Sequence, residues 1–95
     1  MYLDLIDKRK LAAMGYFSAL SGFYDRILNR SASSQHDWNS AFQHTVSFIG
    51  HALHLLEGFP NQDDRFVTNL SSSLRDILRQ CQEMNQDLKK RGLVN

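Results

Sequence analysis

The chain has 95 residues, and its 11 Lys and Arg against 10 Asp and Glu give a formal net charge of +1. This length predicts one domain over residues 1–95 with a single hydrophobic core, too small for a separate catalytic lobe. The near-zero charge excludes long-range attraction to nucleic acid or an acidic membrane as the basis of binding. One cysteine cannot form an internal disulfide, so we expect a cytoplasmic protein.

The first predicted helix runs from about residue 3 to residue 29. Its apolar residues follow one seam at helical spacing, interrupted only at Lys10: Ile6, Ala13, Phe17, Leu20, Tyr24 and Ile27. The largely apolar run over residues 11–24 is too short to span a bilayer. We therefore expect a helix that packs into a core, with no membrane partner.

A second stripe of small residues follows the same helix, about 100° round from the bulky seam: Ala12, Gly15, Ala19 and Gly22. Two glycines inside a helix cost roughly 1 kcal/mol each relative to alanine, so a close neighbour should compensate. One interpretation packs this stripe against Ser47 and Gly50 of the next helix. The other leaves it as a groove or as a contact with a second copy of the chain.

The second predicted helix covers about residues 35–57 and stops at Gly58. Its apolar stripe is wide enough to lie between two neighbouring helices: Trp38, Phe42, Thr45, Val46, Ile49, Leu53 and Leu56. Trp38 is expected to act as the hydrophobic anchor at the start of this helix.

The third predicted helix covers about residues 62–91 and carries the most regular pattern of the chain. Its apolar positions alternate at spacings of three and four: Val67, Leu70, Leu74, Ile77, Cys81, Met84 and Leu88. We expect Asn61 to cap its start, and Gly92 to end it in the left-handed conformation with Leu93 folding back. Cys81 is expected to be a buried, inert thiol.

No segment alternates as a strand does, so the fold class is all-α. Short connections make consecutive helices antiparallel, which predicts an up-down-up three-helix bundle. Charged pairs are scarce beside the third-helix seam, which indicates a compact bundle and not a free-standing coiled coil.

More apolar residues are present than one inward stripe per helix needs, and homodimerisation could complete the bundle by covering them. They include Leu5 and the candidate partner-binding residues Tyr16, Phe23, Phe48, Leu55, Phe66 and Leu78, with Gly15 and Gly22 allowing close approach. The alternative is that they only flank the core. Our leading hypothesis is a non-enzymatic protein-protein interaction module, an adaptor, regulator or inhibitor, which acts as a homodimer.

Two other hypotheses rest on polar residues. His51 and His54 lie one helical turn apart with Glu57 a further turn on, which is the basis for a metal- or small-ligand-binding protein or a pH-dependent surface. No cysteine pair or metal-binding motif accompanies them, so we expect no metal and no cofactor.

The second alternative is a nucleic-acid-associated regulator that uses basic residues of the third helix: Arg75, Arg79, Lys89, Lys90 and Arg91. Acidic residues interrupt this face, so a solvated helix surface is the preferred interpretation. No catalytic constellation is present in the pattern, and we expect no enzymatic activity.

Overall fold

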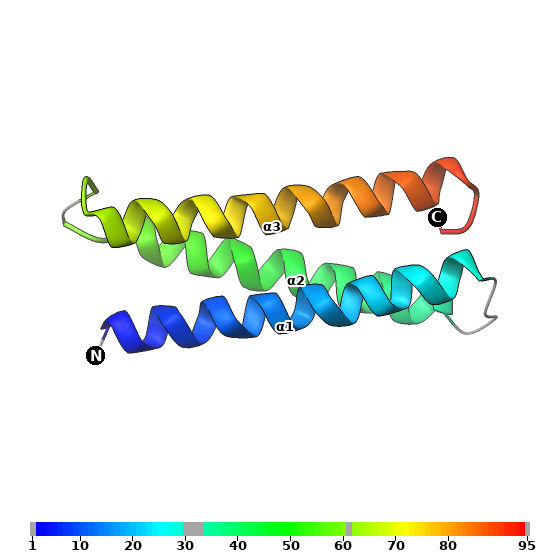
Figure 1. The fold of residues 1–95 in the computed structure, drawn as a ribbon, viewed down its shortest axis with the longest axis horizontal. Coiled ribbons are helices and arrows are strands. Elements are labelled where there is room, and N and C mark those ends of the chain that lie inside the picture. The colour runs from blue at the N-terminus through cyan, green and yellow to red at the C-terminus, as the bar shows by residue number, and fades with distance from the viewer. Residues whose placement is uncertain (1, 30–33, 61, 95) are drawn as a thin grey trace.

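The computed structural model describes residues 2–29, 34–60 and 62–94, with side chains from residue 7 in the first range and from residue 35 in the second. Three helices follow in order: α1 (Tyr2–Leu28), α2 (Ser34–Glu57) and α3 (Arg65–Lys90). Neighbouring helices run in opposite directions along a molecule of 46 × 22 × 15 Å (Figure 1). The expected Leu5 and Ile6 contributions lie outside the described side chains.

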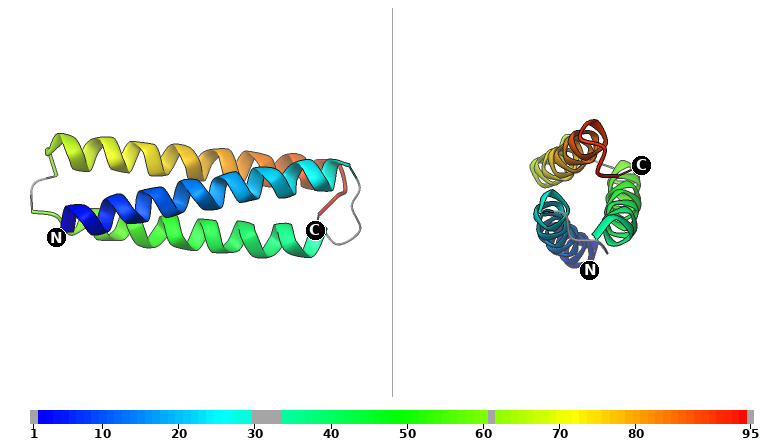
Figure 2. Two further views of the ribbon diagram at one scale, coloured as in Figure 1. Left: turned by 60° about the horizontal axis from the view of Figure 1, so that its bottom comes forward. Right: turned by 90° about the vertical axis from the view of Figure 1, so that its right-hand side faces the viewer.

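Each helix packs against both of the others, and the end-on view shows the three axes at the corners of a triangle (Figure 2). The predicted all-α up-down-up three-helix bundle is therefore confirmed. The seam positions of the sequence supply most of its core, and Ala52 and Val94 add to it without having been predicted.

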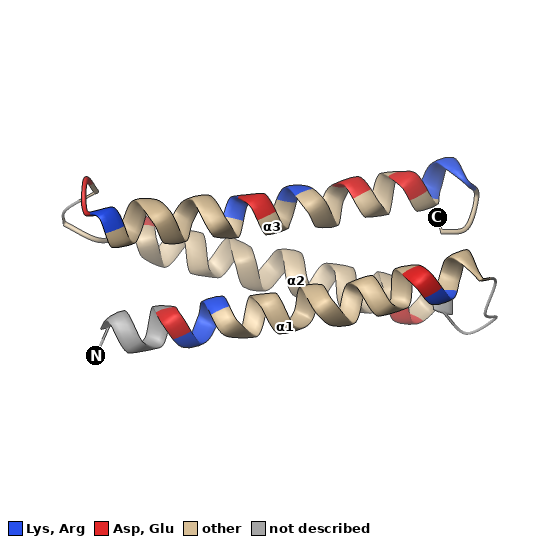
Figure 3. Ribbon diagram, in the orientation of Figure 1, with Lys and Arg blue, Asp and Glu red and all other residues tan. Residues whose placement is uncertain are grey.

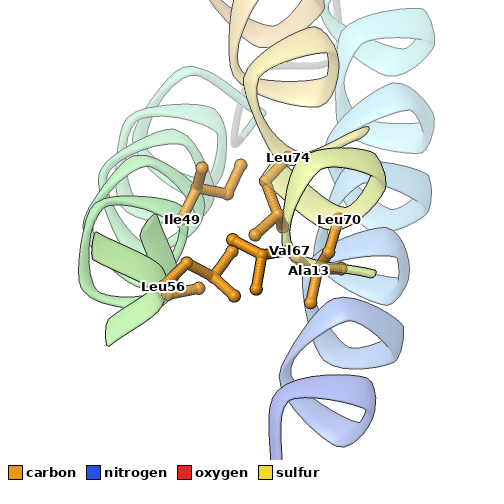
Figure 4. Close-up of a cluster of buried hydrophobic side chains, with 7 residues drawn as sticks. Ala13, Ile49, Leu56, Val67, Leu70 and Leu74 are labelled. Carbon is orange, nitrogen blue, oxygen red and sulfur yellow. The ribbon is translucent and has the colours of Figure 1, made fainter. Parts of the chain in front are cut away.

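One half of the core, which we call the aliphatic cluster, lies at the end of the bundle where α2 turns into α3. Its buried members come from all three helices and converge on one another (Figure 4): Ala13, Ile49, Ala52, Leu56, Val67, Leu70 and Leu74. These side chains contain no polar atom, so they hold this end together only by the apolar area they remove from water and by close packing.

The other half, the tryptophan cluster, consists of Leu20, Ile27, Trp38, Cys81, Leu88 and Val94. Hydrogen bonds accompany its packing. The Trp38 Nε1–H donates to Asn85 Oδ1 at 3.0 Å, joining α2 to α3, and the Tyr24 hydroxyl donates to Asp87 Oδ2 at 2.5 Å, joining α1 to α3. Trp38 also stacks on Phe42 with ring centroids 6.2 Å apart.

Thr45 is a polar residue in the core of the bundle. Its side chain is wholly buried, and its Oγ1 has no hydrogen-bond partner among the described residues. The buried Thr45 hydroxyl without a partner opposes folding, because it has lost its hydrogen bonds to water.

Ile77 on α3 packs against both clusters, so the core is continuous along the bundle.

The start of α3 differs from the expectation. The helix begins at Arg65 and its N-cap is Asp64, whose Oδ1 accepts a hydrogen bond from the Phe66 N–H at 2.7 Å. The prediction that this helix starts near residue 62 with Asn61 as its N-cap is therefore wrong. Asn61 itself lies outside the described residues. Asp is as good a cap as Asn, so the preference for capping residues does not by itself distinguish Asp64 from Asn61.

The end of α3 follows the expectation. Gly92 has φ of +72°, and its N–H bonds to the Lys89 carbonyl while the Leu93 N–H bonds to the Leu88 carbonyl. These two bonds form the Schellman motif, which turns the chain back on the helix. Val94, which is 5% exposed, thereby packs into the tryptophan cluster.

Candidate interaction surface

The charged residues are distributed unevenly over the three helices (Figure 3). Residues 11–24 of α1 and residues 38–56 of α2 contain no Asp, Glu, Lys or Arg, whereas α3 has an uncharged stretch of residues 66–74 only and carries charges along its remaining length. Exposed helix faces of globular proteins normally carry charged side chains. These two stretches of α1 and α2 carry none.

The exposed residues of these two uncharged stretches form what we call the uncharged surface. On α1 they are Leu11, Ala12, Met14, Gly15, Tyr16, Ser18, Ala19 and Gly22, and on α2 they are Ser40, Gln43, His44, Ser47, Gly50, His51, His54 and Leu55. The most exposed of the large apolar side chains is Leu11 at 68%, followed by Met14 at 47% and Tyr16 at 42%.

Leu11 and Met14 were absent from the predicted partner-binding set. Both stand in an apolar run with bulky residues on several sides of the helix, so spacing alone did not mark them as outward-facing. Their spacing from the seam residue Ala13 contains the signal that could have found them, because Leu11 lies two residues away, about 200° round the helix, and Met14 lies one residue away, about 100° round.

The small-residue stripe also faces outward. A Cβ atom built at Gly15, Gly22 or Gly50 would meet no heavy atom within 4 Å. The interpretation that packs this stripe closely against Ser47 and Gly50 is therefore wrong. Among the described residues, no close neighbour compensates for the glycines of α1.

A groove of about 390 Å³ joins the α1 and α2 parts of the uncharged surface; its lining includes Tyr16, Ala19, Phe23 and His44. The Tyr16 and Phe48 rings, with centroids 5.8 Å apart, form one contact between the two helices. Phe23 is half-buried, and the Arg26 guanidinium lies 4.8 Å above its ring.

A second hollow, of about 370 Å³, lies nearer the aliphatic end and is lined by Arg9, Phe48, His51, His54 and Leu55. The structure thus brings together Tyr16, Phe23, Phe48 and Leu55 along the border of α1 and α2. The two candidates on α3, Phe66 and Leu78, are half-buried and pack against the aliphatic cluster.

The histidines lie on the outer side of α2, and His51 and His54 are both exposed. His54 Nδ1 is 3.9 Å from Glu57 Oε2, a solvent-exposed pair that contributes little to stability. Within the part of the chain that the structure describes, no three His, Cys, Asp or Glu side chains gather in a way that could hold a metal ion.

Two of the candidate basic residues, Arg79 on α3 and Arg91 at its C-cap, are paired with acidic neighbours. Arg79 bonds to Asp76 at 2.6 Å and to Glu83 at 2.9 Å, and Arg91 lies 3.2 Å from Asp87. The hydrogen bonds that Arg79 donates to Asp76 and Glu83 raise its pKa above the usual value. A hollow of about 690 Å³ lies beside Arg75 and Arg79, where the pairing of Arg79 reduces the positive charge available to an anion.

Cys81 is wholly buried, as expected. Burial raises the pKa of its thiol to about 11, because the low-dielectric interior disfavours the thiolate. The thiolate is the nucleophilic form, so this side chain is poorly suited to covalent chemistry in the folded protein.

In the described residues, no helix combines the length and apolar character needed to cross a membrane. Comparison with known proteins finds no matching family model, and neither a curated protein nor a solved structure matches this chain.

Proposed function

We propose that this chain is a non-enzymatic protein-interaction module that binds another polypeptide through the uncharged surface, with α1 at its centre. The observation that carries the proposal is the outer face of α1, where exposed Leu11 and Met14 adjoin glycines that none of the described residues covers. Adaptor, regulator and inhibitor are the roles that such a module would fill.

The energetic argument concerns both kinds of residue. Each of Gly15 and Gly22 costs the helix roughly 1 kcal/mol relative to alanine, and the chain itself offers no compensating contact. Leu11 and Met14 leave apolar area in water that a partner would remove. A docked helix would use both features, since glycine allows its backbone to come close and the large side chains would be buried.

The chemistry of the chain supports a binding role over catalysis. The cysteine is buried and its thiol pKa is raised, so it is a poor nucleophile. His51 and His54 line one hollow together with Arg9, but no serine, threonine or cysteine is among the residues given for that hollow, so a histidine-activated nucleophile of this kind has no support there.

Site-specific photo-crosslinking in the cell of origin tests the proposal. A photo-reactive phenylalanine analogue placed at Leu11 should crosslink to a polypeptide, and the same analogue at exposed Ser72 on α3 should not. Both positions are exposed, so neither replacement disturbs the core. Equal crosslinking at the two positions, or none at Leu11, would contradict the proposal.

A further inference from the structure

We infer that the polypeptide partner places an acidic side chain in the hollow formed by Arg9, His51 and His54, and an apolar side chain in the hollow next to it. This inference rests on the proposed function and names the chemistry of the partner. It is argued from the residues that line the two hollows, from their charges and from an arginine that has no ion pair among the described residues.

The first hollow, which we call the basic hollow, has a volume of about 370 Å³ and lies between α1 and α2. Arg9 lines it from α1, and four residues line it from α2: Phe48, His51, His54 and Leu55. Of the described residues in this lining, none is acidic and none comes from α3. The basic hollow therefore offers positive charge beside apolar surface, which suits a carboxylate.

Arg9 differs from the other arginines discussed above. Arg79 and Arg91 are paired with carboxylates, whereas none of the described acidic side chains forms an ion pair with Arg9. Arg9 is also half-buried, while the neighbouring Asp7 and Lys8 are exposed. A guanidinium that has lost part of its water is stabilised by a carboxylate, which it can hold through two hydrogen bonds. A partner's carboxylate would supply what the described residues do not.

The second hollow, which we call the apolar hollow, has a volume of about 450 Å³ and carries no charged residue in its described lining. It is lined by Leu55, Gly58, Phe59 and Pro60. Leu55 lines both hollows, so they adjoin. One polypeptide segment can fill both, with an acidic side chain in the first and an apolar one in the second. A small organic anion in the basic hollow alone would stay largely in water, because His51 and His54 are exposed.

The ionisable groups around the basic hollow determine how binding depends on pH. Arg9 stays charged, while histidines gain a proton as pH falls through about 6.5. Glu57 on α2 faces His54, with Oε2 3.9 Å from Nδ1, and competes there with an incoming carboxylate. The two lysines that flank Arg9 in the sequence lie about 100° round α1 and are not part of the described lining, and neither is Asp7. We therefore expect His51 and His54 to strengthen binding in mild acid.

The first test compares two peptides by NMR titration of the wild-type protein: acetyl-Leu-Glu-Leu-Leu-amide and the same peptide with Gln in place of Glu. At a pH of about 5.5 the peptide glutamate is ionised and histidines are largely protonated. The Glu peptide should shift the amide signals of His51, His54 and Leu55 and bind about two- to fivefold tighter than the Gln peptide, as expected for exposed charge pairs.

Three results of this titration would overturn the inference. They are an absence of shifts at about 10 mM peptide, equal binding of the two peptides, and a preference for Glu that does not shrink between a pH of about 5.5 and about 8.

The second test removes the charge of Arg9. Arg9→Gln should weaken binding of the Glu peptide about two- to fivefold and leave the Gln peptide unaffected. Lys8→Gln is the matched control, since it removes one positive charge from an adjacent exposed residue that does not line the hollow. In about 0.1 M salt, which screens distant charges, it should leave both peptides unaffected. Equal losses in the two variants would show a general effect of net charge and overturn the inference.

The third test addresses the apolar hollow. Leu55→Ala should weaken binding of the Glu and Gln peptides by the same factor, because both carry the apolar side chains. Leu11→Ala, which shortens an exposed leucine outside both hollows, is the matched control and should weaken neither. Unchanged melting temperatures show that all four variants remain folded. Normal binding by the Leu55→Ala variant would overturn the inference.

The two proposals fail separately. If the photo-probe at Leu11 captures a polypeptide while the Glu and Gln peptides bind equally, the inference is wrong and the interaction module stands. If the Glu peptide is preferred as expected and nothing is captured at Leu11, the hollows have the inferred chemistry and the proposed function is wrong.

Discussion

The aliphatic cluster contains no polar side-chain atom, whereas the tryptophan cluster holds Trp38 and Tyr24 in place with hydrogen bonds to α3. Apolar packing is non-directional, so it fixes volume better than rotation. The bonds from Trp38 and Tyr24 require particular partners, and they set how α1 and α2 are rotated against α3. The tryptophan end therefore specifies the register of the bundle.

The aliphatic half and the tryptophan half of the bundle also differ in their outer surfaces. Leu11, Met14 and Leu55 are exposed beside the residues of the aliphatic half, so that half is apolar inside and also carries large apolar side chains on its outer surface. Correct orientation of α1 there depends on the hydrogen bonds at the other end. The proposed docking surface thus lies over the half of the bundle with fewer directional contacts.

The largest effect should come from removing the aromatic anchor. Trp38→Ala should lower the free energy of unfolding by about 3–5 kcal/mol, because a large, fully buried side chain leaves a cavity. Urea denaturation followed by circular dichroism measures it. Trp38→Phe keeps an aromatic ring and loses the bond to Asn85, so it should cost less; an equal cost would mean that packing contributes nothing.

At the aliphatic end, a pair of adjacent leucines tests whether packing alone stabilises that half. Leu56→Ala should cost about 3 kcal/mol, since Leu56 is 1% exposed, and Leu55→Ala should cost less than about 1 kcal/mol. The same denaturation experiment compares them. If the two variants were equally destabilised, the assignment of Leu55 to the surface would be wrong.

Thr45 offers a stabilising change within the core. Thr45→Val replaces the unpartnered buried hydroxyl with a methyl group of similar size, and we expect a gain of about 1 kcal/mol. Thr45→Ser keeps the hydroxyl and removes a methyl group, so it should destabilise the protein. A loss of stability in the valine variant would show that the hydroxyl has a partner.

The smallest effect should come from the bond between Tyr24 and Asp87. This bond lowers the pKa of Asp87 below its usual 3.8 and raises the pKa of Tyr24 above 10.0. Its contribution is therefore present between those values, is lost as pH falls through the lowered Asp87 pKa, and is lost again as pH rises through the raised Tyr24 pKa.

Tyr24→Phe measures that contribution. The variant should be less stable than the wild type by about 1 kcal/mol or less near pH 7, and the difference should shrink in acid as Asp87 becomes protonated. Denaturation at pH 7 and at a pH below 3 provides the comparison. A difference that stayed constant across this range would mean that the charge of Asp87 plays no part.

The helical periodicity was sufficient to predict the fold because each seam reports which side of its helix is buried. It predicted the burial of Leu20, Ile49 and Leu74 and the turn at Gly92. It could not predict the bond from Tyr24 to Asp87, which joins residues 63 positions apart and depends on how α1 and α3 are aligned.

The candidate surface was predicted less well, for a related reason. Tyr16 and Leu55 were correctly placed outside the core, while Leu11 and Met14 were missed and Phe66 was placed at a surface although it packs on the core. Where a helix is apolar on several sides, periodicity does not identify the outward side. That depends on the neighbouring helices.

Cys81 makes the opening of this bundle measurable without any substitution. An alkylating reagent can reach its wholly buried thiol only when the tryptophan end separates, and the pKa of about 11 suppresses background reaction in the closed state. The labelling rate therefore reports how often that end opens. A polypeptide partner that holds α1 in place should slow this labelling, which gives a readout of binding from inside the fold.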